Sequence, residues 1–248
     1  MYNEQTISKM NAMKLFGMAK GFEQRIGSPQ HAEMSHAEFV GFLVDDEKIH
    51  RENRRLKQLI KNAKFKQQQA ALEGIDYRHA RGLTKQMIAE LSGTQWIADH
   101  RNILITGPTG VGKTYLACAF GNLAVRAGFP TRYVRAPRLF ETLQQSRGDG
   151  SHIETLERFG KVHVLIIDDL LLTPLSEAER RDLMELIEDR YGAAATVITS
   201  QCPTKDWHQN IGDPTIADAI CDRLLHSAYK IALRGDSIRP EEDKRKAQ

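Results

Sequence analysis

Residues 107–114 read Gly-Pro-Thr-Gly-Val-Gly-Lys-Thr, which satisfies the spacing G-x-x-x-x-G-K-[ST]. Glycines let backbone N–H groups converge on a phosphate, and a helix that begins at the end of such a loop adds its positive dipole end. The lysine would reach the β- and γ-phosphates of a nucleotide, and the threonine hydroxyl would bind Mg²⁺. The motif therefore predicts a phosphate-binding loop (P-loop) for ATP and Mg²⁺. Its nucleotide-binding residues are Gly107, Pro108, Thr109, Gly110, Val111, Gly112, Lys113, Thr114 and Tyr115.

Two adjacent carboxylates follow a second apolar run, at residues 162–167. We expect Asp168 to hold the metal together with Thr114, as a Walker B aspartate does, and Asp169 to orient or activate the attacking water. Many P-loop ATPases carry glutamate at the second position, and aspartate is one methylene shorter. A nucleotide-gated scaffold, in which ATP binding matters and hydrolysis is incidental, therefore stays open as an alternative.

Polar side chains elsewhere are candidates for the same site. Ser200 and Gln201 follow the apolar run 196–199, where they would hydrogen-bond the γ-phosphate or the attacking water, or serve as ordinary loop residues. Arg223 lies in a predicted amphipathic helix. An arginine that stabilises the transferring phosphoryl group can come from a neighbouring subunit, and the competing interpretation of Arg223 is a surface salt bridge.

The elements that must position these residues begin at Asn102. Short apolar runs occur at 103–106, 132–134, 162–167, 196–199 and 229–233, with helical segments between them. That alternation predicts a parallel sheet covered by helices. Ser176 with Glu179, and Asp213 before Pro214, are typical of helix starts.

The first hundred residues read as helices, and one of them is strongly basic. Ser35 and Glu38 form a capping box, and an apolar series follows it and continues through residues 48–66. Residues 48–66 contain eight basic residues and a single acidic residue, Glu52. Such a segment favours contact with DNA phosphates over a merely solvated face. The predicted DNA-binding residues are Arg51, Arg54, Arg55, Lys57, Lys61 and Lys64.

Composition limits the class of protein. The chain has 248 residues, of which 41% are hydrophobic and 27% charged, and no apolar run is long enough to span a membrane. Because no such run is present, we expect a cytoplasmic location. The three cysteines show no CxxC spacing, so we expect reduced thiols. We expect a helical domain at 1–70 that binds DNA or a partner, a helical linker at 71–101 and an ATPase domain at 102–248.

Five motifs follow one another along the chain: the P-loop, the Asp168-Asp169 strand end, Thr199-Ser200-Gln201, Asp222-Arg223-Leu224 and Gly235-Asp-Ser-Ile-Arg239. In their order and spacing they resemble the IstB-like helper ATPases of insertion sequences. These belong to the AAA+ superfamily with the DnaC-type helicase loaders and DnaA-type initiators. The resemblance implies an α/β AAA+ fold, a parallel sheet flanked by helices, after a small all-α N-terminal domain. It also implies a sensor role for Ser200, an arginine finger acting in trans for Arg223, and a sensor-II-like, nucleotide-binding role for Arg239. With these, the catalytic set is Lys113, Asp169, Ser200 and Arg223.

The function implied by the resemblance is an ATPase that assembles on double-stranded DNA as a homo-oligomer with shared active sites. It would assist a transposase in target selection and strand transfer. A DnaC-like replicative helicase loader is the nearest alternative, because it would share every catalytic residue. A small-molecule P-loop kinase is disfavoured, since the basic helical segment would then have no purpose. DNA that runs along Arg138 and Arg147 instead, with the N-terminal helices on the transposase, is a further alternative.

Overall fold

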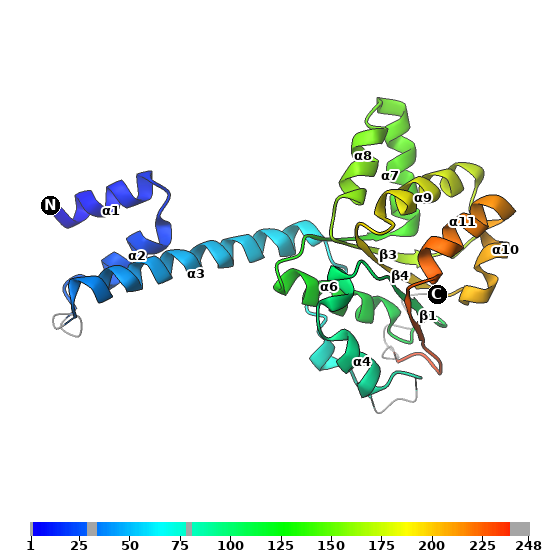
Figure 1. Ribbon diagram of the computed structural model, residues 1–248, viewed down its shortest axis with the longest axis horizontal. Coiled ribbons are helices and arrows are strands. Elements are labelled where there is room, and N and C mark those ends of the chain that lie inside the picture. The colour runs from blue at the N-terminus through cyan, green and yellow to red at the C-terminus, as the bar shows by residue number, and fades with distance from the viewer. Residues whose placement is uncertain (1, 29–33, 78–80, 239–248) are drawn as a thin grey trace. The chain divides into compact units, whose positions relative to one another are not determined.

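The computed structural model describes residues 2–28, 34–77 and 81–238. Contacts between Cα atoms divide the chain into two compact units, Met1–Gln58 and Leu59–Gln248 (Figure 1). The division falls inside a helix, α3, and the functional limits at residues 70 and 101 stay predictions.

The N-terminal unit is helical. It contains α1 (Tyr2–Ala12), α2 (Phe16–Arg25) and the first part of α3 (His36–Ala63). The predicted capping box at the start of α3 is confirmed, because the Ser35 N–H donates to Glu38 Oε2 at 2.9 Å and the Glu38 N–H donates to Ser35 Oγ at 3.3 Å. The apolar series that follows is not enclosed, and Ile49 is 54% exposed.

A carboxylate on α3 binds the first turn of α2. Glu47 Oε2 accepts hydrogen bonds from the N–H groups of Gly17 at 2.7 Å and Met18 at 3.1 Å, so it satisfies donors that the first turn of α2 leaves free. Glycine is required at position 17, because an added Cβ would lie 2.5 Å from the Asp46 carbonyl oxygen. Burial disfavours the ionised form of Glu47, but the donors from Arg51, Met18 and Gly17 outweigh it and lower its pKa.

The C-terminal unit is built on a five-stranded parallel sheet in the order β2-β3-β4-β1-β5. The strands are β1 (Ile103–Thr106), β2 (Thr131–Arg135), β3 (Val164–Leu170), β4 (Ala195–Ser200) and β5 (Tyr229–Ala232). Each overlaps a predicted apolar run, and β3 begins two residues later than its run and extends through Leu170. The P-loop thus follows a central strand, with Ser200 and Asp169 at the same carboxyl edge.

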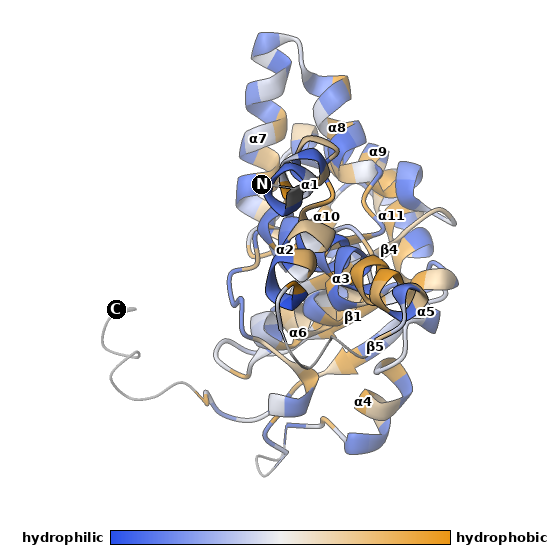
Figure 2. Cartoon of the chain, turned by 90° about the vertical axis from the view of Figure 1, so that its left-hand side faces the viewer, coloured by the Kyte–Doolittle hydropathy of each residue, from blue (hydrophilic) through white to orange (hydrophobic). Residues whose placement is uncertain are grey.

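Helices cover both faces of the sheet. Leu104, Leu165 and Ile198 face a core formed with α7 (Ala136–Asp149), α8 (His152–Gly160), α9 (Glu177–Arg190), α10 (Trp207–Ile211) and α11 (Pro214–Leu225). Helix α6 (Lys113–Arg126) lies on the other face, where Gly121 approaches Ile166. Figure 2 shows the apolar residues on the strands and hydrophilic residues on the outer turns of α7. The predicted caps of α9 by Ser176 and of α11 by Asp213 are confirmed.

The segment between α3 and β1 contains the short helices η2 (Leu72–Gly74), α4 (Lys85–Leu91) and α5 (Gln95–Ala98), and another short helix, η3 (Thr204–Asp206), precedes α10. The first part of the segment lies along α6. Asn122 Nδ2 donates to the Ala70 carbonyl at 2.8 Å, and the Tyr115 hydroxyl donates to the Ala71 carbonyl at 3.1 Å. Tyr115, predicted to bind nucleotide, therefore anchors this segment in the structure.

In the described ranges no helix is both long and apolar enough to cross a membrane. The three cysteines are free, and burial raises the pKa of Cys118 to about 11.

Candidate nucleotide site

The P-loop has the backbone that phosphate binding requires. Gly107 and Gly112 have φ values of 147° and 96°, which only glycine adopts readily. Gly112 is the N-cap of α6 and offers no side-chain cap, so the first N–H groups of that helix are left to an outside acceptor. A loop of this shape at a helix N-terminus binds anions.

Lys113 lies folded against the loop. Its Nζ donates to the carbonyls of Gly107 and Pro108, both at 2.7 Å, and the residue is 6% exposed. The ammonium group of Lys113 is therefore held within the P-loop, where it would neutralise the charge of a bound phosphate.

Asp168 is the centre of a cluster of hydroxyl groups. The carboxylate is fully buried and accepts hydrogen bonds from the hydroxyls of Thr114 at 3.0 and 3.1 Å, Tyr133 at 2.7 Å and Thr199 at 2.6 Å. Burial, followed by the bond to Asp168, raises the pKa of Tyr133, which stays a donor. A carboxylate and hydroxyls are the hard oxygen donors that Mg²⁺ prefers, so these residues fit the predicted metal.

A β-bulge brings the second carboxylate to the same edge. The register between β3 and β4 shifts between Ile167 and Leu170, and Asp169 has a φ of 61°. Its N–H donates to Thr199 Oγ1 at 2.9 Å, and its Oδ2 accepts from Arg135 Nε at 3.2 Å and Nη2 at 3.0 Å. Asp169 therefore lies beside the Asp168 cluster, with its charge engaged by Arg135.

Ser200 and Gln201 are placed differently from each other. Ser200 is fully buried, and its hydroxyl donates to the Leu170 carbonyl at 2.6 Å and accepts from the Cys202 N–H at 3.1 Å. Its side chain is therefore bonded to backbone, and Thr199 is the residue of β4 that contacts both aspartates. Gln201 reaches the P-loop, where its Oε1 accepts from Thr109 Oγ1 at 2.9 Å.

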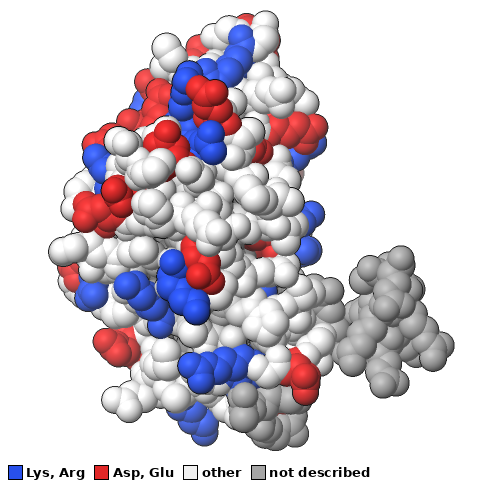
Figure 3. Space-filling model, turned by 90° about the vertical axis from the view of Figure 1, so that its right-hand side faces the viewer, with Lys and Arg blue, Asp and Glu red and all other residues white. Residues whose placement is uncertain are grey.

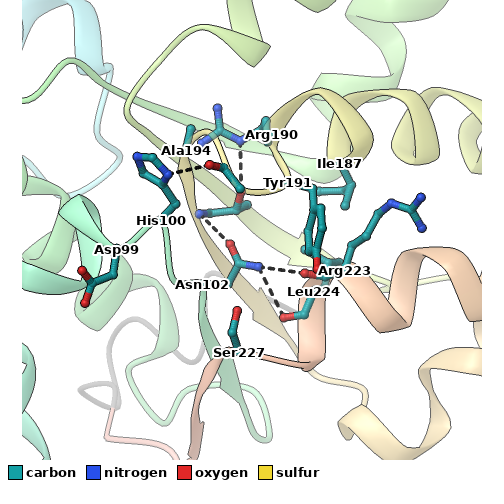
Figure 4. A pocket seen from close by; sticks show the side chains of 12 residues that line it. Asp99, His100, Asn102, Ile187, Arg190, Tyr191, Ala194, Arg223, Leu224 and Ser227 are labelled. Carbon is teal, nitrogen blue, oxygen red and sulfur yellow. Dashed lines mark hydrogen bonds between the residues drawn. The ribbon is translucent and has the colours of Figure 1, made fainter.

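Arg223 lies away from the P-loop of its own chain. Its Nε is 2.6 Å from Glu188 Oε2, and its guanidinium lies 5.9 Å from the centre of the Tyr191 ring. A pocket of about 210 Å³ adjoins it at the amino ends of β1 and β4 (Figure 4). There Asn102 Nδ2 donates to the Arg223 carbonyl at 3.3 Å. The salt bridge that competed with the finger interpretation is thus present in the single chain.

Arg239 lies outside the described residues. The residue before it, Ile238, donates its N–H to the Gly110 carbonyl at 3.1 Å, so the described C-terminal segment ends on the P-loop.

Sequence reasoning missed Tyr133, Arg135 and Thr199. Their signal is weak: each places a polar group within or at the end of a predicted strand. Tyr133 and Arg135 are two residues apart, so strand alternation sets both on the face of β2 that meets the aspartates.

The predicted DNA-binding residues differ in their partners. Arg51 is paired with Glu47 at 2.7 Å, and Arg55 has interactions of its own. Across the described ranges, no carboxylate lies within ion-pair distance of four exposed members of the set: Arg54, Lys57, Lys61 and Lys64.

The basic residues of the alternative DNA surface, on the C-terminal unit, already have acidic partners. Arg138 pairs with Glu141 at 2.6 Å, and Arg147 pairs with buried Asp182. Figure 3 shows one face of this unit, where acidic and basic side chains are interspersed over its upper part.

The sheet order, the P-loop after β1 and the paired aspartates near the carboxyl end of β3 define an AAA+ type P-loop fold. Solved structures agree. The chain superposes on DnaI with a TM-score of 0.57 at 22% identity, covering 74% of this chain and 93% of that one. It superposes on the DnaC helicase loader with a TM-score of 0.53 at 20% identity, covering 65% and 96%. For DnaA bound to AMPPCP and single-stranded DNA the TM-score is 0.53 at 17% identity, covering 67% and 50%. These likenesses establish the fold.

Sequence comparison then gives the family. The model of the IstB-like ATP-binding proteins matches residues 8–247, and the chain belongs to that family. It is 46% identical over 234 residues to the insertion-sequence ATP-binding protein y4pL of Sinorhizobium fredii, covering 94% of this chain and 95% of the relative. It is 44% identical over 204 residues to the ATP-binding protein of insertion sequence IS1162 from Pseudomonas fluorescens, covering 82% and 88%. The resemblance seen in the motifs is confirmed.

Proposed function

We propose that this IstB-like ATP-binding protein is a DNA-dependent ATPase that assembles on duplex DNA with ATP and assists the transposase of its insertion sequence. The observation that carries the proposal is the contact of the P-loop with the first of the two aspartates, between Thr114 and Asp168. Because that contact joins the phosphate loop to a buried carboxylate, it supports a site for a metal-bound nucleotide. The insertion-sequence relatives favour transposition over helicase loading.

In the proposed mechanism, the P-loop N–H groups and Lys113 bind the phosphates. Thr114 and Asp168 would hold Mg²⁺, which would neutralise part of the negative charge of the phosphates. Asp169 orients the attacking water and takes its proton, once its carboxylate is released from Arg135. Thr199 holds both aspartates in place through its hydroxyl, and Gln201 contacts the P-loop through Thr109. Ser200 has a supporting role through its backbone contacts.

Arg223 completes the site of a neighbouring subunit in this proposal. Arg223 lies at the amino ends of the strands, whereas the P-loop of the same chain lies at their carboxyl ends. This separation supports action in trans. Assembly then requires Arg223 to leave Glu188. Arg239 is assigned to nucleotide binding, supported by the contact of Ile238 with Gly110.

DNA contact is assigned to the basic face of α3 and the residue that follows it. The support is electrostatic: in the described part of the chain no carboxylate pairs with Arg54, Lys57, Lys61 or Lys64, whereas Arg138 and Arg147 each have an acidic partner. Contact with phosphates would give affinity for many sequences and a strong dependence on salt.

The test is ATP affinity and ATPase rate, with and without duplex DNA, for the wild type and two variants. We expect DNA to stimulate the wild type, Lys113→Ala to lose ATP binding, and Asp169→Asn to bind ATP but hydrolyse it about 100-fold more slowly. Lys161→Ala, which removes an exposed lysine paired with Glu157, is the control and should behave as the wild type. Wild-type ATP affinity in Lys113→Ala would refute the site. Unchanged turnover in Asp169→Asn would make Asp169 a structural residue and place the catalytic group elsewhere.

A further inference from the structure

A second buried cation lies against the P-loop. Arg81 is 8% exposed, and its Nη1 donates to the carbonyl of Val111 at 3.0 Å, within the loop. Its Nη2 donates to the carbonyl of Asp76 at 2.6 Å. Neither the P-loop motif nor the proposed catalytic set accounts for this arginine.

The guanidinium is packed directly on the last glycine of the loop. A Cβ added to Gly112 would lie 2.9 Å from Arg81 Nη1. Gly112 begins helix α6 with a positive φ, so the space for Arg81 exists only because the loop has glycine there. The cation and the shape of the loop therefore depend on each other.

Arg81 also joins the loop to the C-terminal segment. Its carbonyl accepts from the Arg234 N–H at 2.9 Å, and farther along Ile238 donates to Gly110 at 3.1 Å. Ser237 leaves no room for a side chain at Gly110. The P-loop is thus held from outside by Arg81 and by residues 234–238.

We propose that Arg81 is a positioning residue of the nucleotide site, which acts on the phosphates through the Val111–Gly112 peptide. The proposal rests on the proposed function of the P-loop. A charged donor on the Val111 carbonyl polarises that peptide, which makes the Gly112 N–H a stronger donor. It also fixes the carbonyl away from the phosphates, which would repel it.

The ligand of this arrangement is the diphosphate part that ATP and ADP share. Arg81 lies on the loop itself, whereas Asp169 and Arg223 are assigned to the transfer of the γ-phosphate. Loss of Arg81 therefore weakens the binding of the ground state and of the transition state equally, which raises KM and leaves kcat unchanged. A lost charged hydrogen bond corresponds to about a tenfold loss of affinity for both nucleotides.

The chain offers a matched control in Arg180. Its Nη1 donates to the carbonyls of Leu175 at 3.2 Å and Ile211 at 3.1 Å, and it crowds Gly212 as Arg81 crowds Gly112. In both arginines, Nε is buried without a hydrogen-bond partner in the described part of the chain. Arg180 thus has the same structural chemistry without a phosphate loop.

The experiment compares Arg81→Gln, Arg81→Lys and Arg180→Gln in the full-length protein. ATP and ADP affinities, KM, kcat and the unfolding temperature are measured for each. We expect Arg81→Gln to weaken ATP and ADP about tenfold with kcat within twofold of the wild type, and Arg81→Lys to recover part of that loss. Arg180→Gln should lower the unfolding temperature without changing either affinity.

Equal losses of affinity in Arg81→Gln and Arg180→Gln would overturn the proposal, because Arg81 would then act only through stability. A fall in kcat at unchanged KM would overturn it as well. If Arg81→Gln does not fold, Arg81→Lys decides, since unchanged nucleotide affinity in that variant contradicts a role for the guanidinium fork. Failure of the P-loop assignment itself is seen separately, as ATP affinity retained by Lys113→Ala.

Discussion

The ion pair between Arg135 and Asp169 predicts that the isolated protein hydrolyses ATP below its capacity. Both Arg135 Nε and Nη2 donate to the same carboxylate oxygen, at 3.2 and 3.0 Å. If Asp169 accepts the proton of water, this pair must open first. Arg135→Gln should therefore raise ATP turnover, because the shorter, uncharged side chain removes the ionic attraction.

The magnitude follows from exposure. The Arg135 side chain is 49% exposed and that of Asp169 is 19% exposed, so solvent screens the pair and its contribution is that of a surface salt bridge, about 0.2–1 kcal/mol. At about 1.4 kcal/mol for each tenfold change, turnover should rise by a factor of about 1.5 to 5. A larger rise would require a buried pair.

The assay is steady-state ATP hydrolysis at saturating ATP without DNA, with KM measured alongside. Arg138→Gln is the control, because it removes the exposed pair with Glu141 and should leave turnover unchanged. In an Asp169→Asn background, Arg135→Gln should have no effect. Lower turnover in Arg135→Gln, at unchanged KM, would refute the reasoning and make Arg135 a residue that aids catalysis.

Three further predictions concern DNA, assembly and the N-terminal unit. Four basic residues that have no ion pair within the described ranges are Arg54, Lys57, Lys61 and Lys64. Replacing these four with Gln should weaken binding to unrelated duplexes equally and flatten the log–log salt dependence by about 0.9 per lost contact. An unaltered slope would move the DNA site to the C-terminal unit. Arg223→Ala and Lys113→Ala, each nearly inactive alone, should recover ATPase activity when mixed, and full activity of Arg223→Ala alone would contradict a trans role. Glu47→Gln should destabilise the N-terminal unit by about 1 kcal/mol at pH 7, measured by chemical unfolding. Because the folded pKa of Glu47 is lowered, its contribution is complete above the unfolded pKa near 4.3 and is lost as pH falls through the folded pKa, where the two proteins should converge.

The strands and the P-loop could be predicted because their signals are local. A strand buried on both faces is a continuous apolar run, and the loop motif is contiguous. The capping boxes at Ser35 and Ser176 were readable for the same reason, since each involves residues three apart.

The environment of Asp169 could not be read in that way. Arg135 reaches it only because β2 pairs with β3, a contact between residues far apart in the sequence. The bulge after Ile167 depends on the pairing with β4. Strand alternation alone leaves open whether Thr199 or Ser200 faces Asp168, and the structure places Thr199 there.

The central claim is that ATP binding drives assembly on duplex DNA. Sedimentation velocity of the wild type with a labelled duplex, in ATP with Mg²⁺, in a non-hydrolysable ATP analogue and in ADP, tests it most directly. We predict particles with several subunits per duplex in ATP and in the analogue, and none in ADP or with Lys113→Ala. Particles of the same size in every nucleotide state, including Lys113→Ala, would contradict the claim.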